Sequence, residues 1–166
     1  GRQCFRKGNH KSVLDALGDL KGSTDKEKLR EVFDFVVSKI EWDGTYGIYA
    51  NDNLNKVFTK QTGNGAAINL MMIALLNEHG IAAQPALIST RRHGSPIPVY
   101  PILSQFNHLI ARLEIDGKVQ FIDISNEYRS LECLRINSLN KHALTLEKDN
   151  SRWENIVPKI GVDSYY

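Results

Sequence analysis

The feature that most constrains the fold of this 166-residue chain is a stretch that is apolar on nearly every side, from Ala66 to His79. Its length suits a helix better than a strand, and Gly80 follows at the place of a left-handed C-terminal cap. A helix without a polar face cannot lie at a surface, because its apolar side chains would then meet water. We therefore expect this helix at the centre of a domain, opened by the sharp break at residues 62–65.

The segments before this stretch indicate further helices. Residues 24–27 read Thr-Asp-Lys-Glu, a capping-box pattern, and apolar residues then recur at the spacing of one helical face as far as Ile40. Asn53 is a candidate N-cap for a short helix that runs to about Gln61. A weaker pattern from Ser12 to Leu20 predicts another short helix.

After Gly80 the apolar period changes from that of a helix to that of a strand. The patterns predict strands at Ile81–Thr90, Phe106–Ile115 and Lys118–Ile124, and more weakly at Ala143–Glu147. Pro85 favours a sheet edge or a bulge for the first strand, because proline has no N–H to donate. Helices followed by antiparallel strands predict an α+β fold.

The size and composition predict one domain over residues 21–166, with residues 1–20 as a lead-in and short helix. The first residue is glycine, and we expect the chain to be a segment of a longer protein. A net charge of +2 without a Lys/Arg stripe argues against a nucleic-acid partner, and the apolar stretches are too short for membrane insertion. Cys4 and Cys133 fit neither a zinc site nor a disulfide framework, so no metal and no cofactor is expected.

The Asp116-Gly117 turn predicts a two-residue hairpin in which His108 lies opposite Ser125 and Ile110 lies opposite Asp123. His108 and Asp123 then share one sheet face as diagonal neighbours. An aspartate beside an imidazole fixes its tautomer and stabilises the charged ring, as the base and its orienting group do in a nucleophilic site. The commoner outcome for such a pair is a solvated sheet face without chemistry.

An ordered set of motifs runs along the chain: Gly63-Asn64-Gly65, Gly80-Ile81, Asn107-His108 and Phe121-Ile122-Asp123. Together they resemble the core domain of the transglutaminase-like superfamily, a relative of the papain-like fold, in the branch found in multidomain bacterial proteins, often of Bacteroidetes. The resemblance covers roughly residues 20–160. It implies N-terminal helices, a buried central helix packed on an antiparallel sheet, flanking domains, and a periplasmic or secreted setting.

The family places a cysteine nucleophile at the start of the central helix, where this chain has Gly65. Because glycine has no side chain, the covalent route of the family is closed, and His108 and Asp123 would be a vestigial base and orienter. We expect a small void in place of the sulfur and backbone N–H groups left from an oxyanion site. The resemblance thus implies a pseudoenzyme, a non-covalent module that holds a peptide, a glycan or a protein, or that organises neighbouring domains.

Two other functional classes stay open. One is a hydrolase or acyl-transferase that uses His108 and Asp123 with a different nucleophile; Ser125 is conceivable, although a flat strand lacks the strained turn that such serines occupy. The other is a purely structural spacer.

Candidate binding residues lie around the predicted site. Arg91 and Arg92 suit a carboxylate ligand. His93 could join His108 in a metal site, but two histidines leave it incomplete. The remaining candidates are Asn64, for which turn formation is the commoner role, and Asn107.

Overall fold

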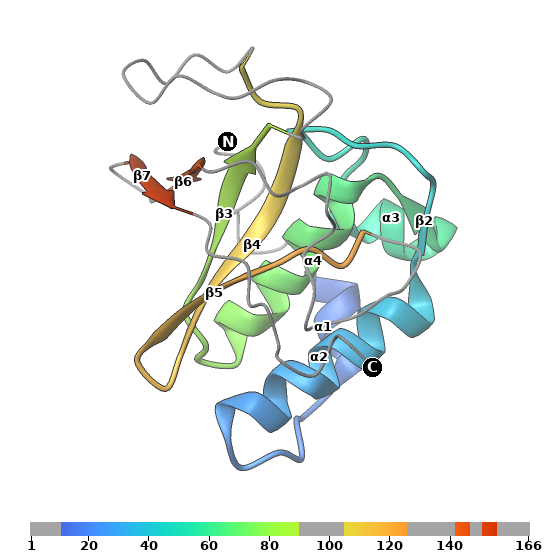
Figure 1. Cartoon of the computed structure of the whole chain (residues 1–166). Coiled ribbons are helices and arrows are strands. Elements are labelled where there is room, and N and C mark those ends of the chain that lie inside the picture. Colours follow the sequence, from blue (N-terminus) through green and yellow to red (C-terminus); the bar gives the residue numbers. More distant parts are fainter. Residues whose placement is uncertain (1–10, 90–104, 126–141, 147–150, 156–166) are drawn as a thin grey trace, which may run out of the picture.

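The computed structural model describes residues 11–89, 105–125, 142–146 and 151–155, and it has an α+β fold (Figure 1). The helices of this part of the chain are α1 (Lys11–Leu17), α2 (Asp25–Lys39), α3 (Leu54–Lys60) and α4 (Gly65–Glu78). The strands of the main sheet are β3 (Ala83–Ile88), β4 (His108–Ile115), β5 (Lys118–Ile122), β6 (His142–Leu146) and β7 (Ser151–Asn155). Their order is β5-β4-β3-β6-β7, and every neighbouring pair is antiparallel. Two short strands, β1 (Glu41–Trp42) and β2 (Thr62–Gly63), form a separate parallel pair.

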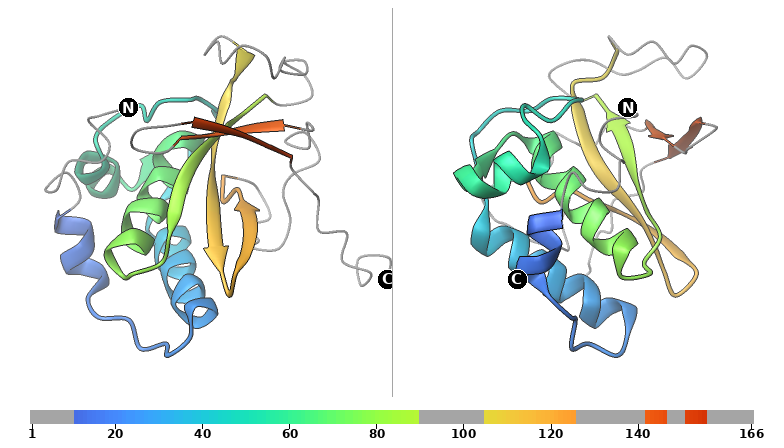
Figure 2. Two further views of the ribbon diagram at one scale, coloured as in Figure 1. Left: turned by 90° about the vertical axis from the view of Figure 1, so that its left-hand side faces the viewer. Right: turned by 180° about the vertical axis from the view of Figure 1, so that it is seen from behind.

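Helix α4 lies at the centre, as its apolar pattern predicts. Every residue from Gly65 to Leu76 is buried, and the helix contacts α2 and α3 on one side and β3 and β4 on the other. Figure 2 shows it between the other helices and the sheet. The side chain of Asn64 caps its start by accepting a hydrogen bond from the backbone N–H of Ala67 at 2.9 Å. Gly80 has a φ of 83°, the left-handed conformation expected just beyond the end.

The other predicted helices are confirmed. At the start of α2, the hydroxyl of Thr24 accepts the Glu27 N–H and the Glu27 carboxylate accepts the Thr24 N–H, so the capping box is complete. Asn53 caps the start of α3, and Gln61 is the residue that caps its end. Helix α1 is shorter than predicted, and its Val13 is fully buried in the main core.

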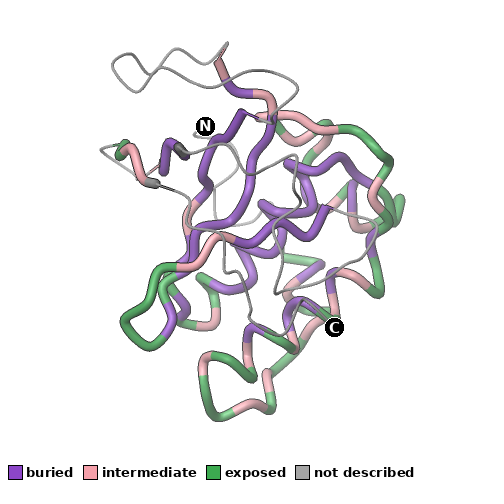
Figure 3. The backbone as a smooth tube through the Cα atoms, in the orientation of Figure 1, coloured by how far each residue is buried: buried purple, intermediate pink, exposed green. Residues whose placement is uncertain are grey.

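The hairpin of β4 and β5 has the predicted register. Asp116 and Gly117 both have positive φ, 53° and 75°, as a tight two-residue hairpin turn requires. Ile115 lies opposite Lys118, and Ala111 lies opposite Ile122. Figure 3 shows that α4, β3 and β4 are largely buried, whereas the hairpin turn is exposed.

The sheet also departs from the predicted arrangement. β3 is the third of five strands and not an edge strand. Pro85 is tolerated there because the pairing with β6 involves only Ala86, Leu87 and Ile88, so no partner on that side requires its missing N–H. No helix among the described residues is both long and apolar enough to cross a membrane.

Candidate functional site

The predicted neighbours His108 and Asp123 are in direct contact. His108 is the first residue of β4, Asp123 follows the last residue of β5, and the Nε2 and Oδ2 atoms are 2.7 Å apart. Both side chains are closed off from solvent, with exposed fractions of 0% and 1% for the two residues. The register of the tight hairpin therefore produces a buried dyad instead of a pair on a solvated sheet face.

The second oxygen of Asp123 is held by three further donors. Oδ1 accepts hydrogen bonds from Asn69 Nδ2 at 3.0 Å, from the backbone N–H of Ser125 at 2.9 Å and from the Ser125 hydroxyl at 2.5 Å. Burial by itself raises the pKa of Asp123, but the attraction of His108 and these hydrogen bonds outweigh it and hold the pKa below its ordinary value. The carboxylate is therefore ionised at neutral pH.

Asn69 was not singled out by the sequence pattern, yet it completes the site. It is fully buried in α4, where its side-chain amide donates to the carbonyl of Leu109 at 2.9 Å as well as to Asp123, and accepts from the backbone N–H of Ile124 at 3.1 Å. One side chain thus connects the central helix to β4 and to the segment that follows β5. Its only signal in the sequence is a polar residue inside an otherwise apolar helix.

The space beside Gly65 is filled, so the predicted void is wrong. A Cβ atom built on Gly65 would lie 2.7 Å from His108 Cε1 and 2.9 Å from Ser125 Oγ. These distances are shorter than van der Waals contact. Because residue 65 has no side chain, the imidazole and the serine can pack directly against the start of α4.

The imidazole of His108 has one nitrogen in use. Nε2 faces Asp123, whereas Nδ1 is buried and has no hydrogen-bond partner among the residues that the structure describes. The ring of Tyr46 covers the imidazole at a centroid distance of 4.5 Å and an interplanar angle of 61°. A buried ring nitrogen without a hydrogen-bond partner is uncommon, because most buried polar atoms in proteins have one.

Two backbone donors at the start of α4 already have acceptors. The N–H of Gly65 donates to the carbonyl of Thr45 at 2.9 Å, and the N–H of Ala67 donates to the Asn64 side chain. The indole of Trp42 donates to the same Thr45 carbonyl at 2.8 Å. The sequence predicted oxyanion-type N–H donors at the helix start, and two N–H groups there, those of Gly65 and Ala67, are used within the chain in this structure.

Ser125 does not have the geometry of a nucleophile. Its hydroxyl lies 3.2 Å from His108 Nε2, the same nitrogen that meets Asp123, and it donates to the Asp123 carboxylate. In a catalytic triad the nucleophile and the aspartate bind opposite nitrogens of the ring. Ser125 is also fully buried.

The remaining candidates are only partly placed by the structure. Asn64 caps α4 and also donates from Nδ2 to the Tyr49 carbonyl at 2.9 Å, so it has the structural role of a turn residue. Asn107 is half-buried, and its backbone N–H donates to Ile88. Among the described residues no group of three or more His, Cys, Asp or Glu side chains could hold a metal ion. The candidates outside the described residues are Arg91, Arg92 and His93, together with Cys4 and Cys133.

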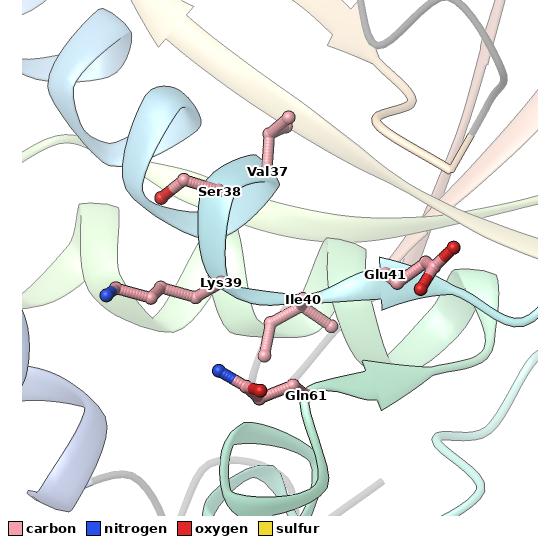
Figure 4. Close-up of a pocket in the computed structure, with 6 residues that line it drawn as sticks. All are labelled: Val37, Ser38, Lys39, Ile40, Glu41 and Gln61. Carbon is pink, nitrogen blue, oxygen red and sulfur yellow. The ribbon is translucent and has the colours of Figure 1, made fainter.

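An open pocket lies away from the dyad, at the end of α2 (Figure 4). It has a volume of about 290 Å³, and its lining contains no member of the dyad or of its hydrogen-bond network. Its lining residues are Val37, Ser38, Lys39, Ile40, Glu41 and Gln61.

Comparison with known proteins finds a likeness among solved structures. No family model matches the sequence, and no curated protein matches it. Among solved structures, the crystal structure of a "putative protease" from Parabacteroides distasonis ATCC 8503 superposes with a TM-score of 0.64 at 14% sequence identity. The match covers 87% of this chain and 27% of that chain, so this chain corresponds to about a quarter of the other protein. At this identity the likeness shows a shared fold.

Proposed function

We propose that this chain is a catalytically inactive domain of the transglutaminase-like type, which acts through non-covalent contacts with a peptide, a glycan or a protein. The observation that supports the proposal most directly is the packing at Gly65. The position that would carry a nucleophile has no side chain, and its surroundings leave no room for a Cβ atom. Covalent acyl chemistry by the route of that family needs a nucleophile within reach of the imidazole.

The dyad then has a structural role. His108, Asp123, Ser125 and Asn69 form a buried hydrogen-bond network that ties β4, the end of β5 and α4 together. A substrate would have to reach this network through the rings and backbone that cover it. The full burial of all four residues is what a structural network requires.

The proposed setting is a larger exported protein of a bacterium. The chain spans 27% of its structural neighbour, which comes from Parabacteroides distasonis. We infer that flanking domains accompany this one and that it works in the periplasm or outside the cell. Organising those neighbouring domains would then be part of its function.

The test is an activity assay against a matched variant. Wild-type protein and the His108→Ala variant are incubated with a panel of peptides and with an acyl donor plus a primary amine. We expect no turnover above the uncatalysed rate in either sample. Turnover in the wild type that disappears in the variant would show an enzyme and would overturn the proposal.

The unpartnered Nδ1 of His108 favours a second candidate, a hydrolase in which this nitrogen acts as a general base. In that case a group other than residue 65 must supply the nucleophile. The same assay separates the two candidates, because only the hydrolase requires His108 for turnover.

A further inference from the structure

Among the described strands, β5 forms one edge of the main sheet (Figure 2). The two-residue turn makes Ile115 and Lys118 a pair that exchanges hydrogen bonds, and along an antiparallel ladder such pairs alternate with pairs that do not. The N–H and C=O groups of Val119 and Phe121 therefore point away from β4. Within the described residues, no hydrogen bond joins these four groups to another strand or loop.

The side chains of the same two residues make this edge apolar. Val119 is 43% exposed, and Tyr49 is the only other large apolar side chain that is exposed in the part of the chain that the structure describes. Phe121 is half-buried and packs against a small apolar cluster of the sheet, which includes Ile88 and Ile110. Another strand at this edge would satisfy the main-chain groups and cover the exposed apolar surface.

Nothing in the sequence of β5 protects the edge. Proteins usually prevent edge pairing with charged side chains, proline or a bulge. The opposite edge strand, β7, carries Arg152 and Glu154. β5 carries a charge only at its first residue, Lys118, and its register with β4 continues without a bulge to Ile122. The edge at β5 is therefore open to pairing.

We propose that β5 is a self-association surface, through which two copies of this chain pair edge to edge and join their sheets. The two strands run antiparallel about a twofold axis at Gln120, so that Val119 of each copy lies opposite Phe121 of the other. These two pairs exchange hydrogen bonds through the four outward main-chain groups of each copy. The inference goes beyond the proposed function and does not depend on it.

The sequence of β5 is complementary to its own copy in this register. On one face, Val119 packs beside Phe121 of the other copy, a β-branched and aromatic pair of the kind that stabilises neighbouring strands. On the other face, Lys118 lies opposite Ile122 of the other copy, and the two lysines are four positions, roughly 14 Å, apart. Parallel pairing would instead place the two lysines side by side. The twofold arrangement uses both β5 edges, so the assembly closes as a dimer.

The contact is small, and the dimer is accordingly weak. It covers the edge of one five-residue strand on each copy, well below the area of a standard stable interface. We expect association that increases with concentration in the high micromolar range.

Sedimentation equilibrium of the chain from about 10 μM to about 1 mM tests the proposal. Val119→Lys places a charge opposite Phe121 of the other copy. We expect it to raise the dimer dissociation constant at least about tenfold, because each dimer loses two side-chain pairs. Tyr49→Lys is the matched control, since it removes the other exposed large apolar side chain, which lies in the loop before α3. Its dissociation constant should stay within about twofold of the wild-type value.

A disulfide across the twofold axis tests the register separately. Gln120 would lie opposite its own copy in a pair without hydrogen bonds, with Cα atoms about 4.5 Å apart, a separation that suits a disulfide. The native cysteines, Cys4 and Cys133, are first replaced by serine. Gln120→Cys should then cross-link under copper phenanthroline. Lys118→Cys, on the same face, should not, because roughly 14 Å is too far for a disulfide.

A wild type that stays monomeric at about 1 mM would overturn the inference. Association that Val119→Lys leaves unchanged, or equal cross-linking at positions 118 and 120, would also overturn it, because either result places the contact elsewhere. The cross-link decides the question independently if Val119→Lys does not fold. Turnover in the activity assay would overturn the proposed function and leave the dimer standing.

Discussion

At Gly65 a single methyl group would meet the imidazole of His108 at 2.7 Å and the Ser125 hydroxyl at 2.9 Å. The neighbours cannot easily move away, because Asp123 holds both of them through hydrogen bonds. The glycine is therefore needed for its small volume and not for a special backbone conformation. The same packing that excludes a nucleophile keeps the dyad buried.

The packing predicts a cost for Gly65→Ala. Overpacking should lower the free energy of unfolding by about 1–3 kcal/mol, although alanine is the better helix former. When His108 is also replaced by alanine, the cost of Gly65→Ala should fall by about 1 kcal/mol or more, because the closest contact of the added methyl group is then gone. Urea unfolding of the wild type, the two single variants and the double variant measures both values. An identical cost in the two backgrounds would contradict the contact.

For single residues, the sequence predicts that two side chains on neighbouring strands are in contact, but it does not predict the hydrogen-bond network around them. The contact of His108 with Asp123 follows from a two-residue turn, since alternation along two strands fixes which side chains share a face. The contacts of Asn69 do not follow from any local pattern, because they depend on which side of α4 meets β4. The filled space at Gly65 was also mispredicted, because the relaxation of neighbouring side chains is a tertiary effect.

Among the elements, α4 depends on one polar side chain to fix its position. Apolar residues surround this helix, and apolar contacts alone permit rotation and sliding between alternative packings. The three hydrogen bonds of Asn69 to Leu109, Asp123 and Ile124 are satisfied in only one orientation. Asn69 thus selects one packing of the helix on the sheet.

Asn69→Ala should lower the free energy of unfolding by about 2–4 kcal/mol, because it leaves buried polar groups of the sheet without partners. The matched control is Asn77→Ala in the same helix. Asn77 is exposed, and its side chain bonds to the backbone of Ala83, so its loss should cost about 1 kcal/mol. Chemical unfolding of both variants provides the comparison, and equal losses would argue against a special role for Asn69.

Elements with local signals could be predicted, and elements that depend on distant partners could not. Three features depend only on residues that are close in the sequence, and these could be predicted. They are the capping box at Thr24, the apolar residues of α4 and the Asp116-Gly117 turn. The two-residue strands β1 and β2 exist only because they pair with each other. The central place of β3 is set by β6, which lies more than fifty residues later in the chain.

For the whole molecule, the buried network makes stability depend on pH. The pKa of Asp123 is lower in the folded state than in the unfolded chain, where it is about 3.9. The unfolded state therefore binds more protons in acid, and stability increases with pH in this range. The contribution of Asp123 is fully present above its unfolded pKa and is lost as the pH falls through the folded pKa.

Acid unfolding should therefore differ between matched variants. The wild type should lose stability steadily from about pH 5 down to pH 2, whereas Asp123→Asn should start less stable and show a flatter curve. Asp52→Asn is the control, because Asp52 is partly exposed and its ion pair with Lys60 is screened by solvent. Urea midpoints measured across this range give the curves. Parallel curves for the wild type and Asp123→Asn would show that the dyad does not carry the dependence.

The exposed turn at Asp116 and Gly117 is a suitable site for attaching a label or a linker. Asp116 is eight residues beyond His108, a separation of roughly 27 Å at the rise of an extended strand. A fluorophore or a surface linker attached there would leave the start of α4 unobstructed. Immobilisation through this turn would therefore allow partners to be captured from solution without blocking the region where they are expected to bind.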